Sequence, residues 1–490
     1  MAANPVKGYR AGPWAARLAG SLGLVFAAPA SAHVFAQSYA LPIPFWMYAT
    51  GAASALLLSF VAIGVLAAAP RWSGVAVRPQ AQDAREGDSH RFCAAGAVAL
   101  GLLALCIASG LAGAANAYQN FNMTFFWIVF VLAVPYLAAV AGDFYAPMNP
   151  WQALVACLER LGGRAFNGRL QEPARWGHWP AVALYAAFIH VELFAHLQPR
   201  GLSLLLLAYS LLNVAGAWVF GRASWFRQGE FFGVMLRVLG SMAPLEWRPE
   251  GWRWRPPFAG LLRESPRDMG LVVFVLFMLS STAFDGLHGT LPWANFYWSS
   301  LNPVLTGGLG LSPRELNALS AQLYSAWQRG VLVVSPFAYL VVFAAVIAAM
   351  KVALRPNLGW RELLFRFTFS LVPIAFVYHV THYFTLLLAQ GGQILSLVSD
   401  PLGLGWNLFG TGQWKIEPLM LDMGTLWHTQ VALIVAGHVA SVWVAHLQAL
   451  ALSGCPRRAA ASQLPMLVLM MGFTAFGLWI LSLPLGTTGG

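Results

Sequence analysis

Residues 120–141 read NFNMTFFWIVFVLAVPYLAAVA, a stretch that is almost entirely apolar and contains no charged side chain. A helix of about 20 such residues is long enough to cross the hydrocarbon core of a bilayer. Lipid offers the backbone no hydrogen-bond partner, so a segment that crosses it must be helical. The stretch therefore predicts a transmembrane helix.

The composition extends this interpretation to the rest of the chain. Of the 490 residues, 58% are hydrophobic and 10% are charged, whereas a soluble domain has about 25% charged residues. This balance excludes a water-soluble globular enzyme, a disordered chain and a nucleic-acid-binding domain. The net charge of +11 is then expected to reflect basic cytoplasmic loops. We therefore expect membrane lipid, and no nucleic acid, as a partner.

Hydropathy predicts an all-α, polytopic transmembrane helix bundle with about ten spans. The expected spans are residues 41–69, 91–116, 120–141, 177–198, 201–221, 268–284, 330–350, 367–389, 425–448 and 465–485. Basic residues gather in alternate loops, for example Arg160, Arg164 and Arg169 after the third span. By the positive-inside rule these loops are cytoplasmic, and both mature termini lie outside.

The first 32 residues have the three-part pattern of a secretory signal. A basic start precedes the apolar stretch LAGSLGLVFAAPA (18–30), and small residues stand at Ala30 and Ala32. Cleavage after Ala32 leaves His33 as the first residue of a single transmembrane domain, 33–490; an uncleaved signal anchor is the alternative. The compact loops are typical of a multi-pass protein of the bacterial inner (plasma) membrane.

Three segments between the spans have distinct expected places. Residues 222–267 are expected at the cytoplasmic interface, because Arg237 interrupts the apolar run 231–244 and tryptophans alternate with arginines in EWRPEGWRWRPPF (246–258). Residues 285–329 and 390–424 are expected to be outer loops. Their glycines, prolines and aromatic residues suit tight turns and an interface or apolar pocket.

Ionisable side chains collect in the outer half of the predicted bundle. Such residues are costly within a bilayer and tend to face the bundle interior or one another. The predicted metal ligands are His33, His190, Glu192, His196, His379, His382 and His428, and the predicted catalytic residues are Asp285, His288 and Asp400. Glu192 and His196 are spaced i, i+4, and His379 and His382 are spaced i, i+3, so each pair shares one helical face.

A divalent zinc or copper ion is the expected cofactor, because a nitrogen-rich ligand set suits both metals. His33 at a mature N-terminus has both an α-amino group and a ring nitrogen for one metal, although a histidine can follow a cleavage site by chance. For each single histidine, a hydrogen bond between helices is the plainer explanation. The presence of many histidines at one depth of the bundle favours a metal site.

Several segments resemble a family of bacterial polytopic membrane proteins known as fenitrothion hydrolases. They are LPIPFWMYATGAASALLLSFVAIGVL (41–66), STAFDGLHGTLPW (281–293), HYFTLLLAQGGQ (382–393), SDPLGLGWNLFGT (399–411) and QVALIVAGHVASVWVAHLQAL (430–450). The resemblance implies cleavage of the P–O–aryl bond of an apolar organophosphorus triester, together with a second membrane subunit. It carries over no catalytic residue, although Asp285, His382, Asp400, His438 and His446 match its recurrent pattern.

Three functions stay open on the sequence. The first is a metal-dependent phosphotriester hydrolase, in which a metal polarises P=O and lowers the pKa of a bound water towards about 7 while Asp285 or Asp400 acts as the base. The second is a permease or another metal-handling protein for copper or zinc. The third is a non-catalytic membrane subunit whose histidines satisfy contacts between helices.

Overall fold

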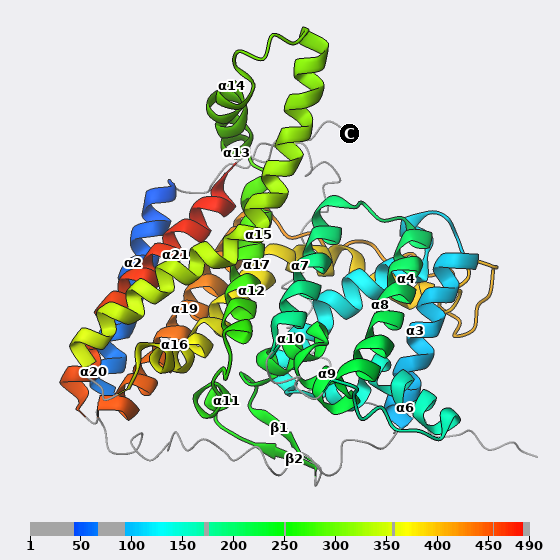
Figure 1. Ribbon diagram of the computed structural model, residues 1–490, viewed down its shortest axis with the longest axis horizontal. Helices are drawn as coiled ribbons and strands as arrows, with labels where there is room; N and C mark the ends of the chain where they lie inside the picture. Colours follow the sequence, from blue (N-terminus) through cyan, green and yellow to red (C-terminus); the bar gives the residue numbers. More distant parts are fainter. Residues whose placement is uncertain are drawn as a thin grey trace, which may run out of the picture. The chain divides into compact units, whose positions relative to one another are not determined.

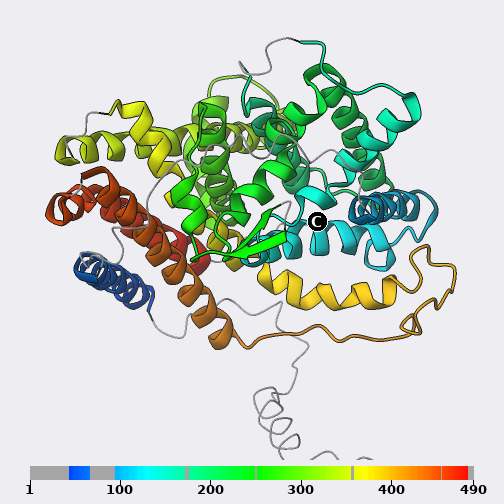
Figure 2. The same cartoon turned by 90° about the horizontal axis from the view of Figure 1, so that it is seen from below.

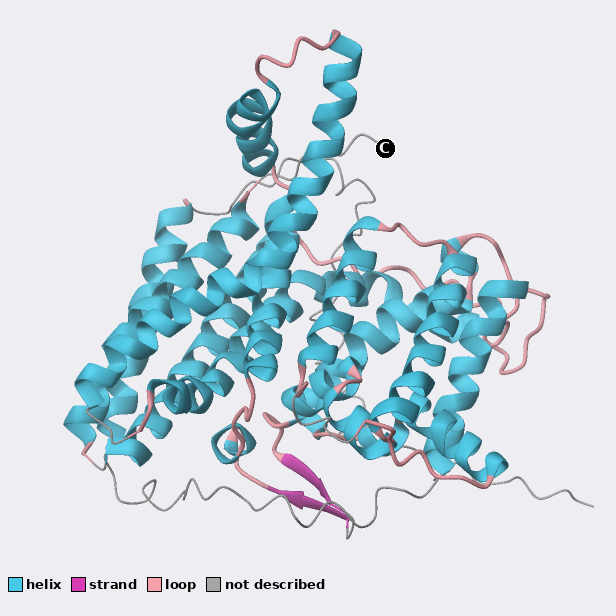
Figure 3. Cartoon of the chain, in the orientation of Figure 1, coloured by secondary structure: helices cyan, strands magenta, loops and turns pink. Residues whose placement is uncertain are grey.

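The computed structural model describes residues 44–66, 94–170, 176–248, 251–354, 358–453 and 455–483. All of them belong to one compact unit, Leu41–Gly490. This unit is a bundle of helices, and the described residues include one short hairpin of strands (Figures 1 and 3). The predicted signal segment 1–32 and His33 lie outside the described residues.

Nine helical segments of the described chain are long and apolar enough to cross a membrane. They are α2 (Phe45–Leu66), α3 (Ala94–Ala112), the continuous α4–η4–α5 (Phe121–Ala141), α8 (Pro199–Phe220), α12 (Met269–His288), α15 (Pro313–Leu354), the composite Trp360–Leu397, α19 (Met423–Ser453) and α21 (Leu464–Ser482). Each overlaps a predicted span. The prediction of an all-α, multi-pass membrane bundle is confirmed at this level.

The remaining elements are shorter. The composite segment contains α16 (Trp360–Thr368), η8 (Phe369–Leu371), α17 (Val372–Gln390), η9 (Gly391–Gln393) and α18 (Ile394–Leu397). Between the long helices lie η3 (Ala117–Gln119), η5 (Ala146–Met148), α6 (Pro150–Gly162), α7 (Trp179–Phe194), α9 (Arg222–Gln228), α10 (Phe231–Gly240), α11 (Ala259–Arg263) and α20 (Pro456–Ser462). Of these, α7 corresponds to the fourth predicted span but has only 16 residues.

Helix α12 lies at the centre of the bundle. In its most apolar window 83% of residues are buried, and the value is 72% for the composite segment that contains α17. Helix α12 packs against α7, α15 and α17. The peripheral helices instead expose large apolar side chains such as Leu211, Val341 and Val468. Exposed apolar surface on this scale suits contact with lipid, so α12 and α17 are the helices best shielded from the membrane.

The apolar run 231–244, within the segment predicted to be interfacial, is largely buried inside the protein. It contains α10, of which eight residues are buried, and α10 packs against α5 and α7. Glu230 caps this helix, because its carboxylate accepts hydrogen bonds from the backbone N–H groups of Phe232 and Gly233. The run is too short to span a bilayer and apolar enough to be buried as a core helix.

The tryptophans that follow this run lie on a short hairpin. Strand β1 (Leu245–Arg248) pairs antiparallel with β2 (Gly251–Trp254), and Trp247 stands opposite Trp252. Trp247, Trp252 and Trp254 are all exposed. A surface hairpin that presents tryptophan beside arginine suits the headgroup region of a membrane.

The predicted outer loop 285–329 is largely helical. Helix α12 continues to His288, and α13 (Leu291–Phe296), η7 (Tyr297–Leu301) and α14 (Asn302–Thr306) follow it. Helix α15 then begins at Pro313, not near 330, and its 42 residues make it roughly 63 Å long. That is about twice the thickness of the hydrocarbon core, so its first turns project beyond the other helices together with α13 and α14 (Figure 1). Hydropathy underestimated α15 because this projecting part carries polar residues.

Residues 398–422, in the second predicted outer loop, form a long connection without regular secondary structure, drawn in orange in Figure 2. Gly403, Gly405 and Gly410 have φ values of +69°, +82° and +74°, a region that favours glycine. The Asp400 carboxylate closes the first turn, since it accepts hydrogen bonds from the backbone N–H groups of Leu404 and Gly405. The expected loop character of this segment is therefore present.

Candidate functional site: an acid–base cluster

A carboxylate and an imidazole from the two central helices form an ion pair. The Nε2 atom of His382 on α17 lies 2.7 Å from the Oδ2 atom of Asp285 near the end of α12. The Tyr383 hydroxyl donates a hydrogen bond of 2.6 Å to the same oxygen. The Asp285 side chain is 15% exposed and that of His382 is 28% exposed. The pair is thus largely shielded, and the imidazole is its more exposed member.

A glycine allows the helices to approach closely at this point. Gly286 follows Asp285, and a Cβ atom at its position would lie 2.8 Å from Cγ2 of Ile480 on α21 and 3.8 Å from Nδ1 of His382. A contact of 2.8 Å is too short for two carbon atoms without a shift of one of them. Glycine is therefore suited to a position where α12, α17 and α21 come together.

A second carboxylate reaches the pair from a third helix. Glu192, near the end of α7, interacts electrostatically with Asp285 and His382, and the Tyr383 hydroxyl lies close enough to interact with it. Helix α7 packs against α12, and the Tyr185 hydroxyl on α7 lies 3.4 Å from Ser281 Oγ on α12. Two carboxylates, an imidazole and a phenol from three helices are thereby gathered inside the bundle.

Two further histidines flank this group. The His379 ring lies 5.0 Å from that of Tyr383 and 5.7 Å from that of Tyr136, measured between ring centroids. The Nδ1 atom of His288 donates to the Asp285 backbone carbonyl at 2.8 Å and lies 3.7 Å from Oδ1 of the same residue. We call Glu192, Asp285, His288, His379, His382 and Tyr383 the acid–base cluster.

The other predicted site residues lie elsewhere. His190 contacts Phe194 on its own helix. His428, near the start of α19, donates from Nδ1 to the Gly424 carbonyl, and its Nε2 atom lies 3.5 Å from the Tyr48 hydroxyl on α2. Asp400 closes a loop turn. His196 leaves the face it was predicted to share with Glu192, because α7 ends at Phe194 and His196 has a left-handed φ of 46°. The i, i+4 argument required a helix that does not continue that far.

The described residues do not fit the expected zinc or copper ion. Among them, no group of three or more histidine, cysteine, aspartate or glutamate side chains is placed to hold a metal. Structural and catalytic zinc sites need at least three protein ligands in one coordination shell. Asp285 and His382 are instead bonded to each other, and the third group on them is a phenol. His33 lies outside the described residues.

Only a weak signal in the sequence points to Tyr383. It directly follows His382 in an otherwise apolar span, but no spacing rule relates it to Asp285, which lies 98 residues earlier. Neighbours in sequence do not face the same side of a helix. His382 and Tyr383 both contact Asp285 because the Asp285 carboxylate lies between the directions in which their side chains point.

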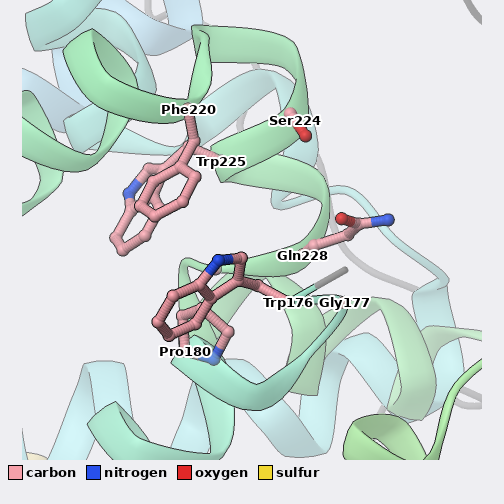
Figure 4. Close-up of a pocket in the computed structure, with 8 residues that line it drawn as sticks. Trp176, Gly177, Pro180, Phe220, Ser224, Trp225 and Gln228 are labelled. Atoms are coloured by element: carbon pink, nitrogen blue, oxygen red, sulfur yellow. The ribbon is translucent and has the colours of Figure 1, made fainter. Parts of the chain in front are cut away.

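A separate, shallow and partly open pocket lies where the start of α7 meets α8 and α9 (Figure 4). Its lining residues are Trp176, Gly177, Pro180, Phe220, Ser224, Trp225, Gln228 and Gly229. None of these side chains titrates in the range of ordinary acid–base chemistry. The pocket is therefore a less suitable reaction site than the acid–base cluster.

Comparison of the chain with protein-family models, with curated proteins and with solved structures found no match. A function must therefore be argued from the chemistry of the acid–base cluster and from the sequence segments described above.

Proposed function

We propose that the chain spans the bacterial inner membrane ten times, with both mature termini outside. Helix α7 is the tenth span. Its 16 residues cover roughly 24 Å, which is short for a helix that faces lipid. Its packing against α10 and α12 inside the bundle supports this assignment, because a helix enclosed by protein need not match the full bilayer thickness. The basic loops support the orientation.

For the function, we propose that the acid–base cluster hydrolyses an apolar ester that enters from the bilayer. The observation that carries this proposal is the 2.7 Å contact between His382 Nε2 and Asp285 Oδ2. A carboxylate bonded to one ring nitrogen fixes the tautomer and orientation of an imidazole and stabilises it when it takes a second proton. The other nitrogen, Nδ1, is then able to act as a general base.

The reaction needs one water and no other reactant. His382 Nδ1 takes a proton from water while the water oxygen attacks the electrophilic centre of the ester. In a phosphotriester, a new P–O bond forms, the P–O–aryl bond breaks, and the aryloxide leaves with the bonding electron pair. The imidazolium then returns its proton to the aryloxide. Tyr383 is a positioning residue, since its hydroxyl donates a hydrogen bond to the same Asp285 oxygen that contacts the imidazole.

Organophosphorus triesters are the first substrates to test, because the sequence segments resemble fenitrothion hydrolases. That resemblance also favours a second membrane subunit as a partner, so the chain should be assayed alone and in membranes of its source. The exposed aromatic residues near α13, such as Phe296 and Trp298, suit the gathering of an apolar ester. General acid–base catalysis typically raises the reaction rate by about 10²–10⁴-fold.

The test is hydrolysis of a nitrophenyl phosphotriester by the purified chain in lipid nanodiscs. We expect His382→Gln to lower kcat/KM by at least about 100-fold and Tyr383→Phe to lower it by less. His428→Gln, a histidine variant outside the acid–base cluster, should keep the wild-type rate. The proposal is wrong if the wild-type protein is active and His382→Gln is equally active.

A proton-coupled permease is the second candidate. Chains of aspartate, glutamate and histidine inside a bundle are typical of proton relays in transporters, and the acid–base cluster joins two carboxylates to three imidazoles. Uptake of a solute into proteoliposomes, driven by a pH gradient and lost in Asp285→Asn, would favour this candidate over hydrolysis. A non-catalytic subunit would show neither activity.

A further inference from the structure

Two buried histidines of α19 have ring nitrogens without a hydrogen-bond partner among the described residues. His438 uses Nδ1 for a 2.8 Å hydrogen bond to the Ile434 carbonyl, but its Nε2 atom has no partner in the described part of the chain. Neither ring nitrogen of His446 has one. Both residues are 0% exposed. Buried polar groups are normally hydrogen-bonded, so each exception requires a physical explanation.

Other unpaired polar atoms lie on the same helix. Ser441 Oγ and Gln448 Oε1 are also buried without a hydrogen-bond partner among the described residues. His438, Ser441 and Gln448 are spaced i, i+3 and i+10, so they lie on one side of α19. His446 is eight residues, or about 12 Å, from His438 along the helix axis. His446 lies about 80° around the helix axis from His438, on the side away from Ser441 and Gln448. We call these four side chains, which follow one another from the middle of α19 towards its α20 end, the α19 polar line.

The α19 polar line is enclosed by other helices. Helix α19 packs against α2, α17 and α21. The His438 ring lies 5.7 Å from the Tyr378 ring on α17, and the His446 ring lies 6.2 Å from the Phe60 ring on α2. The Tyr378 hydroxyl donates to the Phe473 carbonyl. These contacts include no charged side chain, so neither imidazole is fixed in an ion pair as His382 is.

The α19 polar line also points towards the acid–base cluster. Tyr378, which faces His438, and His382 are spaced i, i+4 on α17 and therefore occupy successive turns of one face. The Gln430 side-chain amide, further along α19, donates to the Thr381 carbonyl at 3.1 Å. Helices α17 and α19 are thus held together at the level of the cluster.

We propose that the α19 polar line is a hydrated proton path through the half of the bundle that the acid–base cluster does not occupy. Water binds at buried polar sites where two or more hydrogen-bonding groups are available. His446 has two unpartnered ring nitrogens among the described residues, so it receives a proton on one nitrogen and releases one from the other, and rotation of the ring restores its starting state. His438 receives and releases a proton at Nε2, because its Nδ1 atom donates to the Ile434 carbonyl. Only protons move, so no oxidant or reductant is needed. This function is separate from ester hydrolysis.

Proton flux into liposomes tests the path directly. The full chain is reconstituted with an entrapped pH-sensitive dye, and a potassium gradient with valinomycin imposes the membrane potential. We expect faster acidification than in protein-free liposomes, and at least a fivefold lower flux in His438→Gln and His446→Gln. His428→Gln, on the same helix but outside the α19 polar line, is the matched control and should keep the wild-type flux.

Ser441→Ala tests the path with a variant that should still fold if the histidine variants do not, because it removes one oxygen and adds no volume. We expect it to lower the flux at least twofold. The proposal is overturned if wild-type liposomes acidify no faster than empty ones, or if all three variants match His428→Gln. Ester hydrolysis in detergent is measured in parallel. Flux without hydrolysis refutes only the proposed hydrolase, and hydrolysis without flux refutes only the proton path.

Discussion

The contact between Asp285 and His382 can be tested without any substrate, through the stability of the folded chain. The experiment is a double-mutant cycle, which compares the stabilities of Asp285→Asn, His382→Gln and the double variant with that of the wild-type protein. Each single variant removes the ionic hydrogen bond of 2.7 Å and keeps the approximate shape of the side chain. The double variant then shows how much of each loss belongs to the pair itself.

The expected coupling follows from burial and geometry. A hydrogen bond to a charged group contributes about 1.5–3 kcal/mol to stability. The imidazole is 28% exposed, so solvent weakens the pair and the lower part of this range applies. Tyr383 continues to donate to the remaining oxygen of residue 285 in the asparagine variant. We therefore expect a coupling free energy of about 2 kcal/mol.

The assay is reversible unfolding in mixed detergent micelles, followed by the circular dichroism of the helices at pH 7. Each single variant should lose about 2 kcal/mol, and the double variant should lose much less than the sum. A coupling below about 0.5 kcal/mol, the range found for independent sites, would show that the two side chains do not interact. The acid–base argument for His382 would then lose its basis.

Three further outcomes follow from other contacts. Asp268 caps α12 and lies 2.7 Å from His178; burial alone would raise the pKa of Asp268, but the hydrogen bond and charge of His178 bring it below its ordinary value of 3.8. We therefore expect Asp268→Asn to destabilise the protein by about 1 kcal/mol at pH 7. The measurement is the midpoint denaturant concentration of the wild-type protein and of the variant, and the difference between them should shrink as the pH falls below the ordinary pKa of the carboxyl. Gly286→Ala should lower the free energy of unfolding by about 1–3 kcal/mol and reduce hydrolysis, because its Cβ would crowd Ile480. Gly472→Ala is the control, since nothing lies within 4 Å of its new Cβ, and it should leave stability and hydrolysis unchanged. Dialysis against a chelator should leave hydrolysis within twofold of the untreated rate, and a metal-restorable loss would indicate ligands outside the described residues.

The sequence predicted the membrane helices well because each is determined locally. The apolar character of residues such as 120–141 requires a helix wherever lipid surrounds the chain, whatever the other helices do. The length of α15 could not be obtained in this way. Hydropathy identifies the part of a helix that lies in lipid, and the turns after Pro313 that project from the bundle need no apolar composition.

The acid–base cluster was predicted in part. The cost of placing Glu192, Asp285 and His382 in a bilayer showed that each needs a partner, but the identity of the partner depends on which helices pack together. Spacing rules relate residues on one helix and contain no such information. Seven histidine and glutamate side chains were therefore assigned to one metal site, although His190 and His428 face other surroundings.

The positions of the charged residues also bear on how the bundle assembles. Glu192, Asp285 and His382 lie on α7, α12 and α17, and no two of these helices are adjacent in sequence. On an isolated span each charged side chain would face lipid or an unmatched neighbour, at a cost of several kcal/mol. The pair between Asp285 and His382 forms only after α17 has been inserted and packed against α12. Contact between these central helices is thus required both to stabilise the charges in the membrane and to create the base that we assign to the reaction.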